Sequence, residues 1–333
     1  MSRSVPNPAS AGRPIAVRIS PDLALAAAGR LVSQASNDTE AAARRLVASA
    51  PSHGIDLSLI WATLDQRRRV RQACLAVPGA GRTAMLFLSE PMPEGEDAAQ
   101  ALAERVAVLD AACDHLGQEP SQRVHIAQAL PDPTEPWFVD ALTHARFTMV
   151  GHLSYLRRPA GPTPRPVKPF QTPEGVTLTR VSDLPKSKVD AALVAAMDRS
   201  YVDTLDCPEL CGLRETRDIL ASHKDTGKFD PHTWWLVTYQ GEPHGCALFS
   251  AVPDAASAEL VYLGLSPEIR GKGLGKHLLL QGIEELRRRH ATWPMTLAVD
   301  RRNAPALRLY GALGFRSFGE RIAFVRPVRG LAR

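Results

Sequence analysis

Hydrophobic and polar positions alternate most clearly in the second half of the chain, where they predict a series of short strands. The apolar run Thr233–Tyr239 ends before Gly241 and Pro243, and the run Gly245–Val252 follows it. Two apolar runs separated by such a turn predict a β-hairpin. The pattern predicts a third strand over Glu259–Leu265.

Leucine and isoleucine then recur every three or four residues from Leu274 to Leu286. This is the spacing of one face of an amphipathic helix, which we expect over Gly275–His290. The end of the chain is predicted to form a strand, a helix and a strand: Met295–Val299, Ala304–Leu313 and Phe318–Arg326. Strands that flank two helices in this order predict a mixed α/β (α+β) fold.

The end of the first half resembles the end of the second. A shift of 168 residues brings three pairs into register: Phe147 with Phe315, Gly151 with Gly319 and Arg158 with Arg326. Upstream of these residues, each half contains an apolar strand, a long amphipathic helix, another strand and a short helix. Because order, spacing and ending agree, we predict a duplicated domain.

Proline-rich segments mark the expected boundaries. Proline lacks the backbone N–H that a helix or sheet needs, so residues 160–174 predict an extended linker that contains several prolines: Pro162, Pro164, Pro166, Pro169 and Pro173. Residues 1–14 are polar and predict a disordered tail. We therefore expect one domain over residues 15–159 and another over residues 175–333.

Composition narrows the class of protein. Among 333 residues, 40 Lys+Arg against 35 Asp+Glu give a formal charge of +5. Since both halves are nearly balanced, nucleic acid is not an expected partner. The sequence shows neither a signal peptide nor an apolar run of about 18 residues, so we expect no membrane association and a cytoplasmic location. An odd number of scattered cysteines argues against a disulfide framework: Cys74, Cys113, Cys207, Cys211 and Cys246.

The segment between the third strand and the long helix is rich in glycine and positive charge: Arg270-Gly271-Lys272-Gly273-Leu274-Gly275-Lys276. Glycines let the backbone approach a ligand, and the first N–H groups of a helix lack internal partners. This combination predicts an anion site suited to a diphosphate. The spacing differs from that of a dinucleotide fingerprint, and His277 stands where a P-loop needs Ser or Thr. A purely structural turn is the alternative.

Two motifs are similar to signatures of the GNAT acyl-CoA-dependent N-acetyltransferases. One is Arg270-x-x-Gly273-x-Gly275 after Ser266-Pro267, and the other is the segment Asn303–Phe315. The resemblance covers residues 234–326. It implies two tandem GNAT-like domains, each with a mixed, mostly antiparallel sheet flanked by helices, of which the first is degenerate. A monomer or a homodimer is expected.

The resemblance also implies acetyl-CoA as a co-substrate, with no metal. Acetyl-CoA would lie in a V-shaped gap between the strands Glu259–Leu265 and Met295–Val299. It would be contacted by Leu263, Gly264 and Leu265 at the pantetheine arm, by residues 270–276 at the diphosphate, and by Asn303 and Arg308 near the thiol or the phosphates.

Two side chains are expected to handle protons. The resemblance implies that Glu259 is a general base acting through a water and that Tyr310 protonates the leaving thiolate. A surface carboxylate and a core tyrosine are the structural alternatives. The expected reaction is acetyl transfer to a primary amine of a small molecule or peptide, by direct attack in a ternary complex. A non-catalytic acyl-CoA-binding sensor is the alternative function.

The first half lacks both features. Its equivalent loop carries Glu90, Glu94, Glu96 and Asp97, which would repel a diphosphate, and Leu142 stands where Tyr310 stands in the second half. We therefore expect a degenerate domain that helps packing or completes the acceptor pocket.

The resemblance implies that the acceptor meets residues 191–231, the early helices of the second domain and the loop between them. This segment offers four candidate side chains, of which the acids suit a cationic amine: Tyr201, Asp203, Asp206 and Glu209. A solvated surface is the alternative. Zinc ligation is a further alternative that we do not favour, because the loop has no zinc-site pattern around its candidates: Cys207, Cys211, His223 and His232.

The tandem arrangement also resembles the mycothiol synthase family, which acetylates a cysteinyl amine on a pseudodisaccharide. Two positions depart from that family. Ala298 replaces a tyrosine five residues before Asn303, and Phe249-Ser250 stands where the family places a lysine. The architecture carries over, and a cysteinyl amine is an alternative acceptor.

Overall fold

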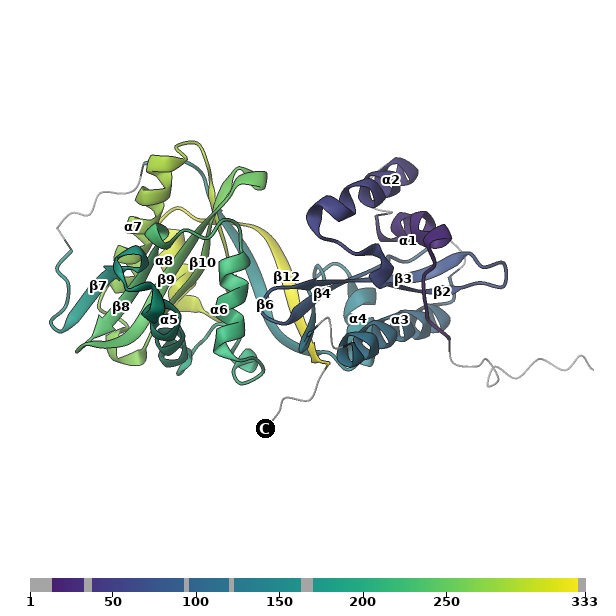
Figure 1. The fold of residues 1–333 in the computed structure, drawn as a ribbon, viewed down its shortest axis with the longest axis horizontal. Helices are drawn as coiled ribbons and strands as arrows, with labels where there is room; N and C mark the ends of the chain where they lie inside the picture. Colours follow the sequence, from purple (N-terminus) through teal and green to yellow (C-terminus); the bar gives the residue numbers. More distant parts are fainter. Residues whose placement is uncertain (1–13, 33–37, 93–95, 120–122, 163–169, 329–333) are drawn as a thin grey trace, which may run out of the picture. The chain divides into compact units, whose positions relative to one another are not determined.

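The computed structural model describes residues 14–32, 38–92, 96–119, 123–162 and 170–328. Residues 1–13 of the expected tail (residues 1–14) and residues 163–169 of the expected linker (residues 160–174) lie outside these ranges. The first half of the chain contains the following helices and strands (Figure 1): β1 (Val17–Arg18), α1 (Ala24–Leu31), α2 (Thr39–Ser49), β2 (Ile60–Leu64), β3 (Val70–Gly79), β4 (Thr83–Leu88), α3 (Ala98–Gln118), β5 (Ile126–Ala129), α4 (Pro136–His144) and β6 (Thr148–Arg158).

The second half repeats this order element by element. It contains β7 (Val176–Arg180), α5 (Lys186–Tyr201), α6 (Thr216–Asp225), β8 (Trp234–Tyr239), β9 (Glu242–Val252), β10 (Ser257–Leu265), α7 (Leu274–Arg289), β11 (Met295–Asp300), α8 (Ala304–Ala312) and β12 (Arg316–Pro327). The predicted strands and helices of this half all appear, with ends that differ by at most three residues. The predicted tandem α/β architecture is confirmed.

The compact units do not coincide with the halves of the sequence. One unit contains the described residues up to Pro78, Thr83–Thr148 and those from Val325 onward, and the other contains Gly79–Arg82 and Met149–Phe324. Strand β6 therefore ends the first half of the sequence but lies in the second unit. It pairs there with β11, from Arg158 opposite Met295 to Leu153 opposite Asp300. The proline-rich segment follows β6 and does not separate the units.

The last strand of each half of the sequence is bonded to the other half, and two equivalent arginines form these bonds. In the second unit, Arg158 Nε donates to the carbonyl of Leu313 just after α8, at 2.9 Å. In the first unit, Arg326 Nη1 donates to the carbonyl of Ala145 just after α4, also at 2.9 Å. Leu313 and Ala145 are themselves equivalent in the repeat. Each final strand is therefore bound to the short helix of the other half.

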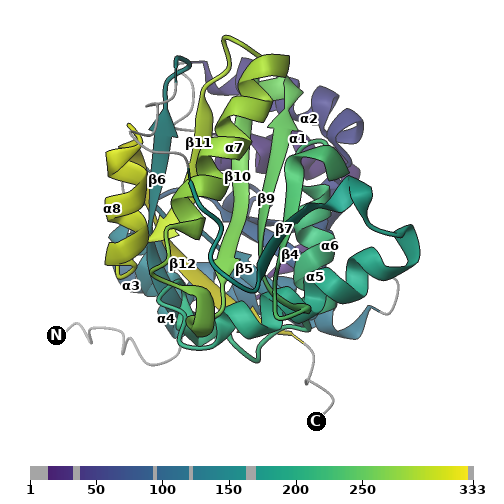
Figure 2. The same cartoon turned by 90° about the vertical axis from the view of Figure 1, so that its left-hand side faces the viewer.

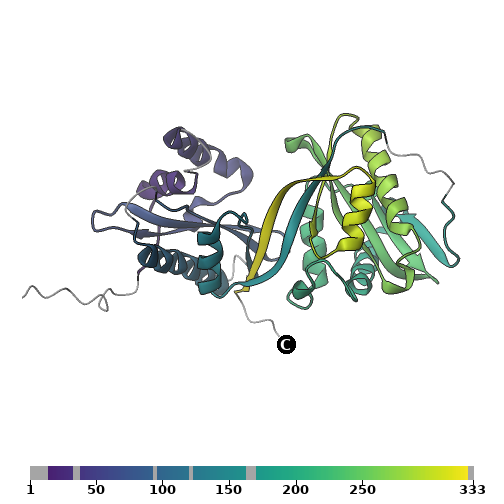
Figure 3. The ribbon, with the colours of Figure 1, turned by 180° about the vertical axis from the view of Figure 1, so that it is seen from behind.

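The second unit has a sheet covered by helices on both faces. Its strand order is β12-β6-β11-β10-β9-β8-β7, and β10 and β11 are its parallel pair (Figure 2). Strands β6 and β12 run side by side (Figure 3). A hydrophobic cluster lies on each face of this sheet, and two neighbouring tryptophans of β8 point to opposite faces. Trp235 packs in the cluster with α7 and α8, whereas Trp234 packs in the cluster with α5 and α6.

The first unit has the strand order β1-β2-β3-β4-β5-β12, and β4 and β5 are parallel. Its longest helix, α3, buries one face that includes Val108, Leu109 and Leu116. No helix among the described residues of either unit is both long and apolar enough to cross a lipid bilayer.

Candidate functional site

Strands β10 and β11 start together and then diverge. Among the described residues, register pairs join only their first residues, Ala258 with Met295 and Glu259 with Thr296. β10 stays paired with β9 as far as Leu265, and a β-bulge follows its last pair with β11. Beyond Glu259, the backbone of β10 is therefore open on the side of β11, as a V-shaped gap requires.

The N-terminus of α7 presents backbone N–H groups without a side-chain cap. Gly271 (φ 74°) and Gly273 (φ 79°) adopt left-handed conformations that favour glycine. Gly273 is the N-cap, and no acidic residue lies in the first turn of this fully described helix. The first N–H groups and the positive end of the helix dipole are thus available to an anion.

The corresponding helix of the first unit is closed to an anion. Asp97 caps α3 by accepting the Gln100 N–H at 2.7 Å. Glu96 lies beside it and pairs with Arg105 at 2.8 Å. Leu142, which replaces the expected acid, is fully buried. Two carboxylates therefore occupy the region where α7 is open, while Glu94 and its neighbours lie outside the described residues.

Arg270 was expected to add charge for a diphosphate, but the structure directs its guanidinium elsewhere. Its Nε donates to the carbonyl of Leu265 at 2.8 Å. Its terminal nitrogens donate to the carbonyls of Ser200, Val202 and Asp203 at 2.9, 2.7 and 3.1 Å. These three carbonyls belong to the C-terminal end of α5 and the loop after it, which lack helical partners. Arg270 therefore fastens that loop to the end of β10.

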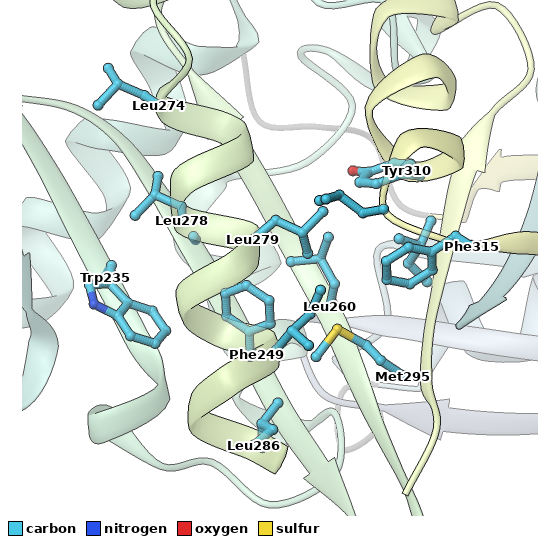
Figure 4. Close-up of a cluster of buried hydrophobic side chains, with 14 of the residues drawn as sticks. Trp235, Phe249, Leu260, Leu274, Leu278, Leu279, Leu286, Met295, Tyr310 and Phe315 are labelled. Atoms are coloured by element: carbon cyan, nitrogen blue, oxygen red, sulfur yellow. The ribbon is translucent and has the colours of Figure 1, made fainter. Parts of the chain in front are cut away.

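Tyr310 lies in the core between α7 and α8. It is 7% exposed, and its ring centre lies 5.8 Å from that of Phe315. Figure 4 shows its hydroxyl pointing away from Phe315 and toward α7. Burial raises the pKa of Tyr310 well above its usual value, so the phenol keeps its proton.

Glu259 lies at the point where the strands diverge. It is half-buried, opposite Ser250 on β9 and Thr296 on β11. Its neighbours Ala258 and Leu260 pack under α7, so Glu259 is on the sheet face of α5 and α6. Burial raises the pKa of its carboxyl group. Its position at the divergence agrees with the expected base, although it is not part of the cavity described next.

A cavity of about 680 Å³ lies among the loop after α5, strand β10 and the first residues of α8. Three of the four expected acceptor residues line it, namely Tyr201, Asp203 and Asp206. The fourth, Glu209, instead forms a bidentate ion pair with Arg302 at 2.5 and 2.8 Å. The structure thus brings three of the four residues to one cavity.

The expected acetyl-CoA residues of β10 line the same cavity, namely Leu263, Gly264 and Leu265, together with Asn303. The side chain of Asn303 caps α8, because its Oδ1 accepts the Ala306 N–H at 3.2 Å. Arg308 is exposed on α8 and does not line the cavity. One cavity therefore joins the open edge of β10 to the expected acceptor segment.

A network of hydrogen bonds fixes the loop after α5. Asp206 Oδ1 accepts the Asp300 N–H at 2.8 Å, and Asp300 Oδ2 accepts the Cys207 N–H at 3.1 Å. Arg302 Nη2 donates to the same Oδ2 at 2.6 Å. Burial raises the pKa of Asp206. Burial acts in the same direction on Asp300, but the hydrogen bonds from Arg302 and the backbone outweigh it and lower that pKa.

The expected zinc alternative is not assembled. Cys207 lies with Asp206 and Asp300, the single group of three such side chains whose ligand atoms converge within 4.8 Å among the described residues. His223 is not in this group. It stacks on Tyr262 with ring centres 5.4 Å apart, and its buried Nε2 has no hydrogen-bond partner among the described residues.

Part of the cavity wall was not anticipated from the sequence. Arg214, His223 and Tyr262 all line it. Strand alternation alone would place Tyr262 with Ala258 and Leu260 on the face of α7, and the β-bulge between Leu260 and Tyr262 turns it to the face of α5 and α6. Arg214 carries no sequence signal either, since a turn far away in sequence holds it. Its Nη2 donates to the Gly81 carbonyl at 3.0 Å and to Ser222 Oγ at 2.7 Å.

Residues 200–315 match the model of the Acetyltransferase (GNAT) family. Two curated relatives are described as mycothiol acetyltransferases. The protein from Acidothermus cellulolyticus is 36% identical over 112 residues, which cover 29% of this chain and 34% of the relative. The protein from Thermomonospora curvata is 31% identical over 175 residues, which cover 53% and 55%. The chain thus spans at most about half the length of these two relatives.

A solved structure extends the likeness in fold to nearly the whole chain. A GCN5-related N-acetyltransferase from Sphaerobacter thermophilus superposes with a TM-score of 0.59 and 16% sequence identity. The superposition covers 96% of each chain. At this identity, the likeness concerns the fold alone.

Proposed function

Because residues 200–315 match the model of the Acetyltransferase (GNAT) family, we propose that this protein transfers an acetyl group from acetyl-CoA to a primary amine. The observation that carries the proposal is the pairing of an uncapped α7 N-terminus with a strand, β10, whose edge is open beside it. Helix N-termini favour diphosphates, and an open strand edge favours an extended amide-bearing arm.

The residues of the second unit fit acetyl-CoA. Leu263 and Gly264 have backbone groups on the open edge of β10, where a pantetheine arm would add as a strand. The backbone of residues 271–276 would hold the diphosphate, with Lys272 and Lys276 nearby in sequence. Acetyl-CoA would supply an activated thioester.

Two side chains support the chemistry of transfer. Tyr310 holds a neutral phenol in the core beside the gap, as a donor to a leaving sulfur must. Glu259 is a half-buried carboxyl group with a raised pKa at the divergence of the strands. A carboxyl group in that state takes up a proton more readily than an exposed one. The cavity beside β10 is the proposed acceptor pocket.

Titration calorimetry with acetyl-CoA tests the proposed binding site. We expect one site per chain, and we expect Gly273→Asp to weaken binding at least about tenfold, because a carboxylate there repels the diphosphate. Gly54→Asp is the matched control, since Gly54 is also left-handed (φ 67°) with open space around its Cα. Two sites would show that the first unit also binds acetyl-CoA. Absence of binding would contradict the proposal.

Transfer itself separates an enzyme from an acyl-CoA sensor. The CoA thiol released from acetyl-CoA is measured with and without a panel of alkylamines, amino acids, aminosugars and cysteinyl amines. Amine-dependent release supports the proposed enzyme. Tight binding without release for any amine would favour a sensor.

A further inference from the structure

Asp206 is a carboxyl group fixed at the wall of the cavity. It lies in the loop that Arg270 fastens, and it keeps an exposed surface where it lines the cavity, although the atoms around its carboxyl group desolvate it. Its Oδ1 accepts the backbone N–H of Asp300 at 2.8 Å. Its Oδ2 receives no hydrogen bond from the described residues. One oxygen thus orients the group, and the other is free to meet a ligand.

The charge of Asp206 lies near the Arg302 guanidinium, whose field lowers its pKa, but the two side chains form no ion pair. Arg302 is the nearby guanidinium, and it donates to Asp300 and to Glu209 at 2.5 to 3.1 Å. No ion pair joins Asp206 to a cation among the described residues. A carboxylate in a concave site without a partner favours a cationic ligand, and a protonated amine is such a ligand.

Asp206 also lies where acceptor and acetyl donor would meet. The cavity that it lines contains Leu263 and Gly264, the residues of the open edge of β10. Burial is the main cause of the raised pKa of Tyr310, and the negative charge of Asp206 raises it further. Glu259, by contrast, does not line the cavity. Of these two carboxyl groups, the one that faces the acceptor space is Asp206.

We propose that Asp206 binds the ammonium group of the acceptor in this cavity and accepts the proton that the amine must lose. The inference rests on the proposed acetyl transfer and specifies its acceptor side, where it assigns the proton acceptor to Asp206 in place of Glu259. The N–H bond breaks toward Oδ2 of Asp206, and the nitrogen lone pair forms the new C–N bond. The C–S bond of the thioester breaks, and Tyr310 gives its proton to the leaving sulfur. As the amide forms, the nitrogen loses its second proton, which returns to the Tyr310 phenolate through solvent, and Asp206 releases the first proton to solvent, so that one proton is set free overall.

The surroundings of Asp206 are consistent with this role. Desolvation of the carboxyl group by its surroundings raises the pKa of Asp206, which improves it as a proton acceptor. The charged and titratable groups that interact with it come from its own loop, from β10, from the end of β11 and from α8: Cys207, Tyr262, Asp300, Arg302 and Tyr310. Arg302 is the one cation in this set, and Asp300 and Glu209 already engage it.

The test is the pH dependence of acetyl transfer in Asp206→Asn. The probe is the amine of the panel that the wild-type protein acetylates fastest. Asparagine retains an oxygen that can accept the Asp300 N–H, so the loop is kept while the proton acceptor is lost. We expect kcat/KM to fall roughly 100-fold or more, and the acidic limb of its pH profile to disappear. Acetyl-CoA affinity, measured by calorimetry, should stay within about threefold of wild type, as expected when a lost interaction serves the acceptor alone.

Two further variants complete the test. Asp254→Asn removes an exposed acid after β9 and should behave like wild type. Glu259→Gln should leave the acidic limb in place, whatever its effect on rate. If Asp206→Asn keeps the limb and Glu259→Gln loses it, Glu259 is the proton acceptor and our inference is wrong. If the wild-type protein binds acetyl-CoA but acetylates no amine, the proposed function fails first, and the inference falls with it.

Discussion

His223 is a histidine that its surroundings keep neutral. It lines the cavity, stacks on Tyr262, and buries an Nε2 that lacks a partner among the described residues. Burial, with a smaller effect from Arg214, lowers its pKa from 6.5 to about 4. The unfolded chain therefore binds a proton at this residue at a higher pH than the folded protein does. Acid destabilises the fold here, and the loss begins below about pH 6.5.

This difference in proton binding between the folded and unfolded states can be measured by denaturant unfolding at pH 7 and pH 5. At pH 5, His223 is mostly protonated in the unfolded state and mostly neutral in the folded state, which costs about 2 kcal/mol of stability. Between pH 7 and pH 5, we expect the free energy of unfolding of His223→Gln to fall by about 2 kcal/mol less than that of the wild-type protein. His53→Gln, at an exposed histidine, should retain the wild-type dependence. Equal losses in wild type and His223→Gln would show that His223 does not carry the effect.

At the scale of elements, helix α7 combines an open N-terminus with a tightly packed middle. Gly282 lets α7 approach β9 closely, since a Cβ at this position would collide with the ring of Phe249. That contact belongs to the core of the second unit, which also holds Tyr310 (Figure 4). In α8, Gly311 has open space around its Cα. A side chain therefore has no room at Gly282 but has room at Gly311.

The two glycines should respond oppositely to the same substitution. Gly282→Ala overfills the core and should lower the free energy of unfolding by about 1–3 kcal/mol. Gly311→Ala removes a flexible residue from a helix without a clash and should raise it by about 0.5–1 kcal/mol. Thermal or denaturant unfolding measures both changes. A stabilising Gly282→Ala would mean that Phe249 moves aside at little cost.

Helices and strands could be predicted from the sequence where hydrophobic residues recur at a clear helical or strand spacing. The leucines of α7 and the apolar runs of β8 and β9 define their own boundaries. The open α7 N-terminus followed from its glycines. The hydrogen bonds of the Arg270 guanidinium could not be predicted, because the sequence does not show that the carbonyls after α5 lie within its reach. Arg214 was missed for a similar reason, since its partner Gly81 is remote in sequence.

At the scale of the whole molecule, the first half of the sequence contributes directly to the second unit. It supplies strand β6 and the turn Gly79–Arg82. That turn contacts α6, where Ser222 Oγ donates to the Ala80 carbonyl at 2.9 Å. Arg214, in the cavity wall, donates to the carbonyl of Gly81. The half whose α3 N-terminus carries acidic residues thus supports a wall of the cavity in the second unit. Local patterns could not reveal this, because they do not say which copy a strand joins.

A substitution in that turn should affect the acceptor alone. A Cβ on Gly81 (φ 72°) would collide with the Asp218 carbonyl and crowd Arg214. We expect Gly81→Ala to raise the KM for the probe amine about tenfold, the equivalent of about 1.4 kcal/mol. The dissociation constant of acetyl-CoA should not change. Gly54→Ala, at a left-handed glycine with open surroundings, is the control. A parallel loss of acetyl-CoA binding would show that the turn supports the whole unit instead.

The exchange of final strands has a consequence for synthesis on the ribosome. Met295, where the partner of β6 begins, is translated about 140 residues after Arg158, which at 5–20 residues per second takes roughly 7–28 s. During that time, β6 has neither β11 nor β12 to pair with, so both of its edges are without their partner strands. Its polar and basic residues, among them His152, Arg157 and Arg158, disfavour pairing with other nascent chains. The same polar and basic residues that occupy β6 in the folded sheet thus oppose its aggregation before its partner strands have been synthesised.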